Sequence, residues 1–124
     1  MRTTLTRERA GSWSWILQAM TGVLLILLVG LHMIGNHFVV KGGLRTYADV
    51  VKYLSTPFIF GWEVIFLIVV AWHALLGVRA ILLDFGLSRS LERGLNIVLA
   101  VIGVATVVYG LWLSVVIVSR GASG

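Results

Sequence analysis

Two histidines in long apolar stretches of this chain are the residues best able to do chemistry. His73 lies in the string from Trp72 to Asp84, and His32 lies in a separate hydrophobic run. An ionisable side chain inside an apolar membrane span is costly, so it marks a functional site by default. Neutral imidazole is a common axial ligand of haem iron, and the chain has no cysteine that could serve instead. The two histidines therefore point to bound haem b.

The residues that follow His73 extend this interpretation. Gly77 lies one turn further on the same helix face, where the missing side chain lets a flat group approach the backbone. Arg79 and Asp84 mark the polar end of the run; Arg79 can pair with a haem propionate or extend to the lipid headgroups, and Asp84 can cap the helix or pair with Arg79. A membrane histidine can also only hydrogen-bond a neighbouring helix.

The composition requires a membrane protein. Of the 124 residues, 59% are hydrophobic and 12% are charged, about half the charged share of a soluble domain. Three apolar runs, Trp13 to Ile34, Pro57 to Leu83 and Leu95 to Val118, are each long enough to cross a bilayer as a helix. We predict an all-α integral membrane protein that forms a single domain over residues 1–124, with spans at about 13–37, 57–84 and 92–118 and an outer loop at 39–56.

Local signals locate the ends of the elements. Pro57 suits the first position of the second helix behind a hydroxyl cap, and Gly86 can end that helix in a left-handed conformation. We expect Glu63, early in the same helix, to stay solvated near the interface. The outer loop contains a candidate interfacial helix with Leu44, Tyr47, Val50, Val51 and Leu54 at helical spacing. Small residues predict close helix packing at Gly22, Gly30, Gly103 and Gly110.

The basic residues predict the orientation. One side of the membrane holds Arg2, Arg7, Arg9, Arg79, Arg89 and Arg93, and the other holds Lys41, Arg45, Lys52 and Arg120. This bias of six against four places the N-terminus in the cytoplasm and the C-terminus outside a cell membrane. The net charge of +5 indicates anchoring at the lipid interface and no nucleic-acid partner, because the basic residues lie close to the helix ends.

The two histidines lie at different depths. His32 is about 24 Å from the cytoplasmic start of the first helix, counted from Ile16, and His73 is about 15 Å from the cytoplasmic end of the second, counted from Leu83. They are therefore not expected to hold the same iron, and each haem needs its second ligand from elsewhere, most simply from a partner subunit. His37 is turned about 140° away from His32 and lies closer to the outer surface, where it is the weakest ligand candidate.

The pattern His73-x-x-x-Gly77-x-Arg79-x-x-x-x-Asp84 resembles the second-helix signature of succinate dehydrogenase membrane-anchor subunits. The first helix of these subunits is similar to the stretches Trp15-x-x-Gln18-x-x-Thr21-Gly22 and Leu31-His32-Met33, with His37. The smaller, D-type anchor is similar to the stretches Gly42-Gly43-Leu44-Arg45 and Ser55-Thr56-Pro57-Phe58. The resemblance covers most of residues 13–85, and the third helix carries no signature.

The resemblance implies a cytochrome b anchor of succinate:quinone oxidoreductase, one half of a two-subunit, six-helix haem-binding bundle. By motif match, His73 is a ligand of the haem nearer the iron–sulfur subunit, and His32 is a ligand of a second, outer haem where two are present. The implied partners are a second haem-binding anchor, an iron–sulfur subunit and a flavoprotein, with FAD and iron–sulfur clusters in those partners only. A two-haem arrangement is linked by this analogy to menaquinone.

One departure from the family concerns the quinone site. Many members have a tyrosine after the aspartate, and here the residue is Phe85, which cannot donate a hydrogen bond. Polarisation of the quinone must then come from partner chains, from Asp84 indirectly, or from Ser12, Ser14 or Gln18. The chain itself offers no flavin-binding fold and no iron–sulfur ligands, so it is expected to be a non-catalytic subunit.

Other interpretations remain open. Quinol:fumarate reductase uses a related anchor, whereas the cytochrome b subunits of hydrogenases and formate dehydrogenases usually need four or more helices. A non-redox small membrane protein, such as a transporter or an assembly factor, is the third alternative. A transporter is expected to show a mid-membrane acidic residue or a broken helix, and the sequence indicates neither.

Overall fold

The computed structural model describes residues 2–39, 41–43 and 46–123, with side chains for residues 12–38, 41–43 and 46–123. The chain forms α1 (Arg2–Ile34), a π-helical turn (Gly35–Val39), α2 (Tyr47–Leu54), α3 (Pro57–Leu83) and α4 (Arg89–Ala122). The described residues contain no strand, so the predicted all-α fold is confirmed. Three stretches are long and apolar enough to cross a membrane, as predicted: Ser12–Phe38, Pro57–Leu83 and Arg89–Ala122.

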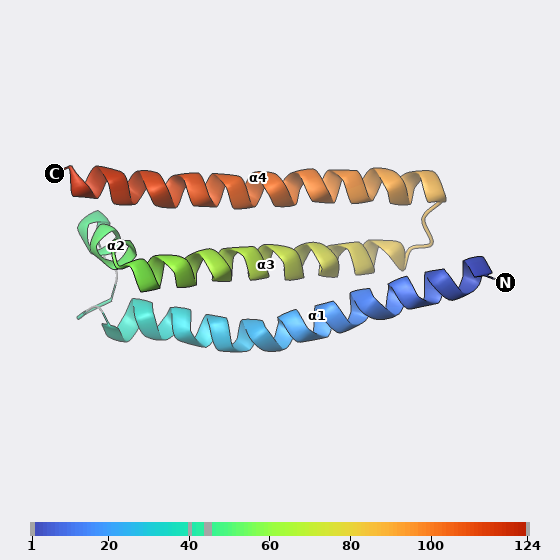
Figure 1. Ribbon diagram of the computed structural model, residues 1–124, viewed down its shortest axis with the longest axis horizontal. Coiled ribbons are helices and arrows are strands. Elements are labelled where there is room, and N and C mark those ends of the chain that lie inside the picture. The colour runs from blue at the N-terminus through green and yellow to red at the C-terminus, as the bar shows by residue number, and fades with distance from the viewer. Residues whose placement is uncertain (1, 40, 44–45, 124) are drawn as a thin grey trace.

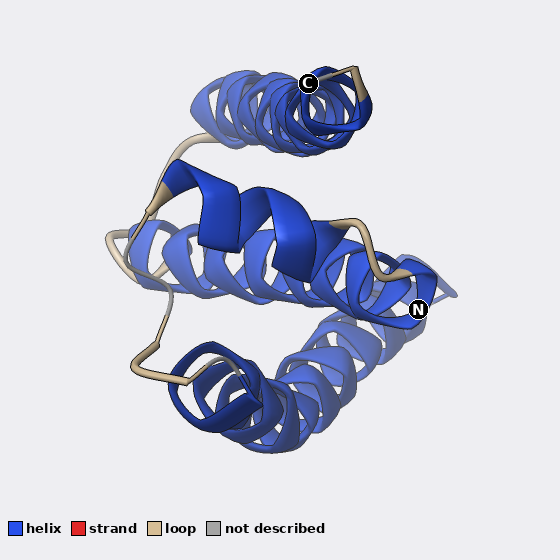
Figure 2. Cartoon of the chain, turned by 90° about the vertical axis from the view of Figure 1, so that its left-hand side faces the viewer, coloured by secondary structure: helices blue, strands red, loops and turns tan. Residues whose placement is uncertain are grey.

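The three long helices lie side by side with α3 in the middle (Figure 1). Helix α3 contacts both α1 and α4, whereas α1 and α4 do not contact each other within the described residues. The end-on view agrees, with α1 and α4 on opposite sides of α3 (Figure 2). The N-terminus and the α3–α4 connection lie at one end of this row, and α2 and the C-terminus lie at the other. We call these the N-terminal end and the α2 end.

The helix ends follow the local sequence in most places. Pro57 occupies the first turn of α3, but the hydroxyl cap expected before it is not formed, because the side chain of Thr56 makes no capping bond. Gly86 has a φ of 71°, the left-handed conformation expected after α3. Helix α2 begins with a capping box in which the Thr46 hydroxyl accepts from the Asp49 N–H and the Asp49 carboxylate accepts from the Thr46 N–H.

Small residues allow the helices to approach closely at three of the four predicted positions. A side chain at Gly22 would meet His73 on α3, and side chains at Gly103 and Gly110 would meet leucines of α3. At Gly30 no other helix of the described residues lies within 4 Å of the place where a Cβ would be, so the close packing predicted there stays a prediction. Gly30 is exposed on α1.

An open row of helices leaves much of the chain's apolar surface uncovered. Among the described residues only Leu28 and Tyr53 are buried, while Ile26 and Phe58 are 74% and 79% exposed. Contiguous apolar surface of this kind needs a lipid or protein covering. The fold is therefore one part of a larger membrane assembly or a structure surrounded by lipid on most sides.

Helix α2 confirms the short helix expected in the outer loop, although Leu44 lies outside the described residues. It packs across the α2 end against α3 and α4, where Val51 sits against Gly121. The side chains of Arg2, Arg7, Arg9 and Arg45, which enter the orientation argument, also lie outside those described. The predicted orientation therefore stays a prediction.

Candidate functional site

His73 lies on the face of α3 that packs against α1. Its Nδ1 is 3.0 Å from the Thr21 hydroxyl oxygen, and that hydroxyl also lies 2.7 Å from the Leu17 carbonyl and 3.1 Å from the Gln18 carbonyl. A threonine hydroxyl has one hydrogen, and a backbone carbonyl can only accept. The shorter contact assigns the Thr21 hydrogen to the Leu17 carbonyl, and with that assignment its oxygen accepts from His73 and Nδ1 carries the proton.

This hydrogen bond determines what the imidazole can do. With the proton on Nδ1, the neutral ring has its free lone pair on Nε2. Metal-ligating histidines typically donate one ring N–H to a fixed acceptor and coordinate through the other nitrogen. The His73–Thr21 pair therefore has the donor arrangement required of an axial haem ligand.

Two glycines create the space around this pair. A Cβ on Gly22 would stand 3.2 Å from Cε1 of His73, so the imidazole ring lies directly against the α1 backbone. A Cβ on Gly77 would stand 3.1 Å from Nε2 of Gln18. The room expected at Gly77 for a flat ligand is thus used, on this face, by the Gln18 amide. The amide oxygen of Gln18 is buried and has no hydrogen-bond partner among the described residues.

Arg79 points to the other neighbour of α3. Its Nε donates to the Asn96 side chain at 2.7 Å, and its Nη2 donates to Glu92 at 3.3 Å, both on α4. The pairing with Asp84 considered from the sequence is not formed; Asp84 is exposed at the C-cap of α3. The reason is rotational, because Arg79 projects toward α4 and Asp84, five residues further on, is turned about 140° away.

His32 forms a second polar centre toward the α2 end. Its Nδ1 lies 2.8 Å from one Glu63 oxygen and 3.0 Å from the other, and the Tyr53 hydroxyl donates to Glu63 at 2.9 Å. The Glu63 side chain is 15% exposed. The expectation of a solvated Glu63 is wrong, because α2 folds back over the start of α3 and places Tyr53 on the carboxylate.

Tyr53 is held in place from both sides. It is 6% exposed, and Gly35 in the π-helical turn leaves the room into which its hydroxyl projects. Burial, together with the hydrogen bond to Glu63 and the negative charge there, raises the pKa of Tyr53 to about 12. Its hydroxyl therefore stays protonated and remains a donor to the carboxylate. π-Helical turns are frequent at functional sites.

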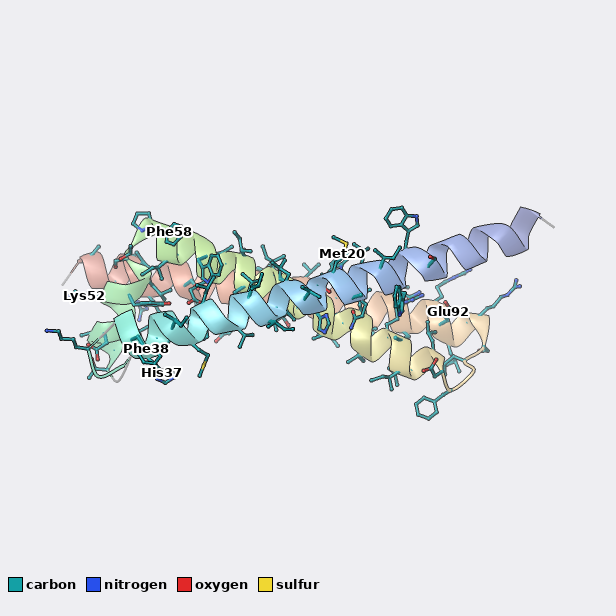
Figure 3. The ribbon with its side chains drawn as sticks, turned by 90° about the horizontal axis from the view of Figure 1, so that it is seen from below. Met20, His37, Phe38, Lys52, Phe58 and Glu92 are labelled. Atoms are coloured by element: carbon teal, nitrogen blue, oxygen red, sulfur yellow. The ribbon has the colours of Figure 1, made fainter. Side chains whose placement is uncertain are left out.

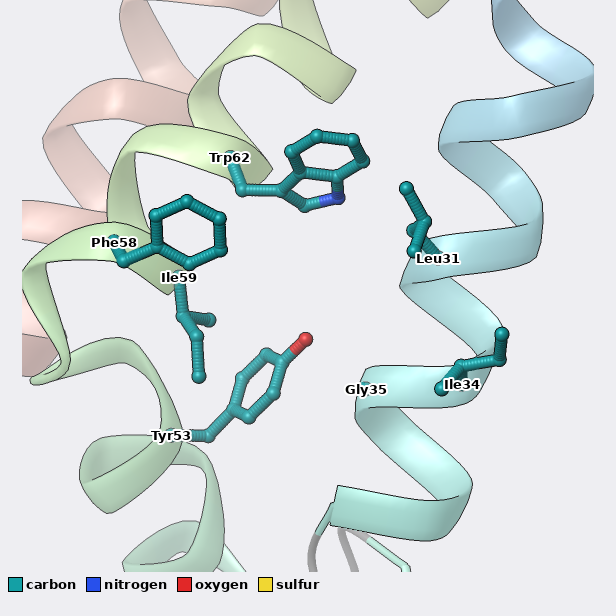
Figure 4. Close-up of a pocket in the computed structure, with 7 residues that line it drawn as sticks. All are labelled: Leu31, Ile34, Gly35, Tyr53, Phe58, Ile59 and Trp62. Atoms are coloured by element: carbon teal, nitrogen blue, oxygen red, sulfur yellow. The ribbon is translucent and has the colours of Figure 1, made fainter.

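Two cavities lie near this centre. One, of about 390 Å³, is an open groove between the long helices whose lining includes His32, Asn36, Tyr53, Glu63, Phe66 and Ser114. The other, of about 200 Å³, is apolar and is seen in Figure 4 between α1 on one side and α2 and α3 on the other. Tyr53 lines both cavities, and its hydroxyl lies against Gly35.

The two histidine centres are far apart along the helices. Thr21 and His32 are separated by about 16 Å on α1, at 1.5 Å per residue. Glu63 and His73 are separated by about 15 Å on α3 by the same measure. The structure therefore keeps the two imidazoles at different depths, as the sequence indicated.

The remaining candidates lie at the two ends. His37 is exposed in the π-helical turn, and Figure 3 shows it at the α2 end with Lys52 and Phe58. Ser14 is half-buried on α1 toward the N-terminal end, and no hydrogen bond joins it to Gln18 or Asp84 within the described residues. The residues that the structure describes contain no cluster of three or more metal-binding side chains.

Three residues of these centres were not identified as functional from the sequence. Thr21 was part of the first-helix motif without a role, Glu63 was assigned to the solvated interface, and Tyr53 had no assignment. The position of Glu63 within an apolar run could have indicated a functional role, since a carboxylate there needs a partner. The partner itself depends on how α1 packs on α3.

The fold and the two half-buried histidine centres define a multi-pass helical membrane protein. The model of the family described as "Succinate dehydrogenase/Fumarate reductase transmembrane subunit" matches residues 2–112. The chain belongs to this family.

Individual relatives agree. The chain is 28% identical to the succinate dehydrogenase hydrophobic membrane anchor subunit of Thermoplasma acidophilum, over 90% of both chains. It is 33% identical to the subunit of the same name from Archaeoglobus fulgidus, over 81% of this chain and 85% of that one. Succinate dehydrogenase 2 membrane subunit SdhC of Mycobacterium tuberculosis is 30% identical over 66% of this chain and 60% of its own. No solved structure matches the chain.

Proposed function

We propose that this chain is the haem-binding anchor of a succinate:quinone oxidoreductase, in which His73 is an axial ligand of haem b shared with a second anchor subunit. The observation that carries the proposal is the hydrogen bond from His73 Nδ1 to Thr21, which leaves Nε2 as the ligating nitrogen. Membership of the family supports the same assignment, since named relatives are membrane anchors of succinate dehydrogenase.

Haem b would supply a one-electron carrier within the membrane, between the iron–sulfur subunit and quinone. The residues of this chain bind and orient it. Thr21 fixes the tautomer of His73, Gly22 lets the imidazole ring lie against α1, and the apolar helices exclude water. Arg79 can still donate to a propionate through Nη1 and the second hydrogen of Nη2, because only its Nε and one Nη2 hydrogen are bonded to α4 among the described residues.

His32 is proposed as a ligand of a second, outer haem. Its distance from the His73 centre, about 15 Å along α3, is consistent with a separate layer of the bundle. Its Nδ1 is already bonded to Glu63, so Nε2 is again the nitrogen that can coordinate iron. The second ligand of each haem is proposed to come from the partner anchor.

The quinone site is proposed at the N-terminal end, on the side of His73 facing the iron–sulfur subunit. Gln18 is the strongest candidate within this chain, because its buried amide oxygen lacks a partner and could accept from a quinol hydroxyl. Ser14 and Asp84 lie toward the same end and are candidates for its rim. With Phe85 77% exposed and unable to donate, any further donor must come from partner chains.

We further propose that the chain sits in the cytoplasmic membrane with its N-terminus inside, that the flavoprotein and iron–sulfur subunits bind at that face, and that menaquinone is the acceptor if two haems are present. The bias of basic residues toward the N-terminal end supports this orientation.

The test is a reduced-minus-oxidised visible spectrum of the purified complex carrying His73→Ala. We expect the inner haem signal to disappear while the complex still inserts, because one histidine contributes little to the insertion free energy of an apolar span. His37→Ala is the matched control, since His37 is exposed at the α2 end and should leave the spectrum unchanged. An unaltered low-spin signal in the His73 variant would refute the ligand assignment.

A further inference from the structure

We propose that Glu63 is a positioning residue for His32: its carboxylate holds Nδ1 and makes Nε2 a stronger electron donor to the outer haem iron. The inference rests on the proposed binding of that haem by His32. Glu63 is part of none of the sequence motifs described above. Its role follows from the contact between α1, α2 and α3.

With Glu63 ionised, both of its hydrogen-bond partners must donate. The Tyr53 hydroxyl donates to Oε1 at 2.9 Å, and His32 Nδ1 lies 2.8 Å from Oε2. An ionised carboxylate can only accept, so Nδ1 of His32 must donate. The lone pair of the neutral ring is then on Nε2, which has no partner among the described residues.

The surroundings fix the direction of the His32 ring. Phe66 packs against it with ring centroids 4.8 Å apart and planes inclined by 35°. Asn36 donates to the His32 carbonyl at 2.7 Å and ties the π-helical turn to the end of α1. His32 lines the open groove of about 390 Å³, so the ring is held at a surface that a flat ligand or partner helix can reach.

The two histidines therefore differ in the charge of the group that accepts their Nδ1–H hydrogen bond. His73 donates to the neutral hydroxyl of Thr21, whereas His32 donates to the carboxylate of Glu63. A carboxylate partner raises the basicity of a ligating imidazole more than a neutral one, because it stabilises positive charge on the ring. A more basic ligand favours ferric over ferrous iron and lowers the reduction potential.

The experiment is a redox titration of the complex with Glu63→Gln, in which the side chain keeps its size and loses its charge. We expect both haems to be retained. At a fixed potential, the ratio of reduced to oxidised outer haem should rise about tenfold, which corresponds to about 59 mV for one electron. The inner haem should keep its ratio, since Glu63 is about 15 Å from His73 along α3.

Thr21→Val is the matched control. It removes the acceptor of the other histidine and should affect only the inner haem. If the Glu63→Gln complex does not assemble, Glu63→Asp keeps the charge and withdraws it by one methylene, and we expect a smaller rise in the same ratio.

The outcomes separate the two proposals. If His32→Ala removes one haem of two but neither Glu63 variant changes the outer-haem ratio, Glu63 only packs against His32 and this inference is overturned. If His32→Ala leaves the haem content unchanged, the outer-haem assignment is overturned and the role of Glu63 with it.

Discussion

Replacing Thr21 with valine tests whether the α1–α3 contact prepares His73 for iron. Valine has nearly the same shape as threonine, so the substitution removes the acceptor of the His73 Nδ1–H without opening a cavity. A buried N–H without a partner costs about 1–3 kcal/mol, and hydrogen bonds between membrane helices average about 0.6 kcal/mol with a maximum of about 1.7. We therefore expect Thr21→Val to weaken haem binding by about 1.4 kcal/mol, which is a tenfold loss of affinity. A tenfold loss is the lower end of the range, about 10–100-fold, by which mutation of a residue that hydrogen-bonds a metal ligand typically lowers metal affinity.

The assay is haem retention by the purified complex in the presence of excess haem scavenger, followed at the reduced b-type absorbance. We expect Thr21→Val to lose the inner haem about tenfold more readily, and Thr21→Ser to behave like the parent because it keeps the hydroxyl. Thr106→Val is the control: Thr106 also donates to the carbonyl four residues earlier, at 2.8 Å, but lies exposed on α4. It should retain haem normally.

Equal haem retention in the Thr21 and Thr106 variants would refute the reasoning. It would mean that the hydroxyl of Thr21 only bonds its own helix, and that the tautomer of His73 is set by another group.

Three further predictions concern the chain as a whole. The isolated chain should not oxidise succinate in a dye-reduction assay, because no flavin or iron–sulfur ligands are expected in it; turnover would contradict an anchor role. Gly110→Ala should destabilise α3–α4 packing by about 1–3 kcal/mol in a denaturant titration in detergent, because the new Cβ would lie 2.6 Å from Leu67, while Gly61→Ala, with nothing within 4 Å, should be nearly neutral; equal effects would argue against the packing. The pKa of Tyr53 is about 12 in the folded chain and 10.0 in the unfolded one. Between these values the unfolded state binds fewer protons, so the free energy of unfolding should fall as pH rises from about 10 to 12. Tyr53→Phe should flatten that fall, and an unchanged slope would show that burial and Glu63 do not raise the pKa of Tyr53 in the folded chain.

The fold was largely predictable because each span carries its own signal. Apolar runs long enough to cross a bilayer must form helices there, since every backbone polar group has to be satisfied within the segment. The three spans, the short helix before Pro57 and the left-handed Gly86 all follow from residues near one another in the sequence. Gly30 shows the limit, because a small residue predicts close packing but cannot say whether a neighbour faces it.

The candidate site was predictable as a set of residues but not as a set of contacts. The sequence singled out His73 and His32 through the cost of an ionisable group in an apolar span. It placed Glu63 in solvent and missed the α4 partners of Arg79, because those contacts depend on how each helix is rotated about its axis.

The class of the protein, its three spans and the depths of its two histidines can therefore be read from the residues alone, since they depend on hydropathy and on a fixed rise per residue. The hydrogen-bond acceptor of each histidine cannot: it is Thr21 for His73 and Glu63 for His32. These partners are far apart in the chain, and side chains on different helices meet only after the helices have packed.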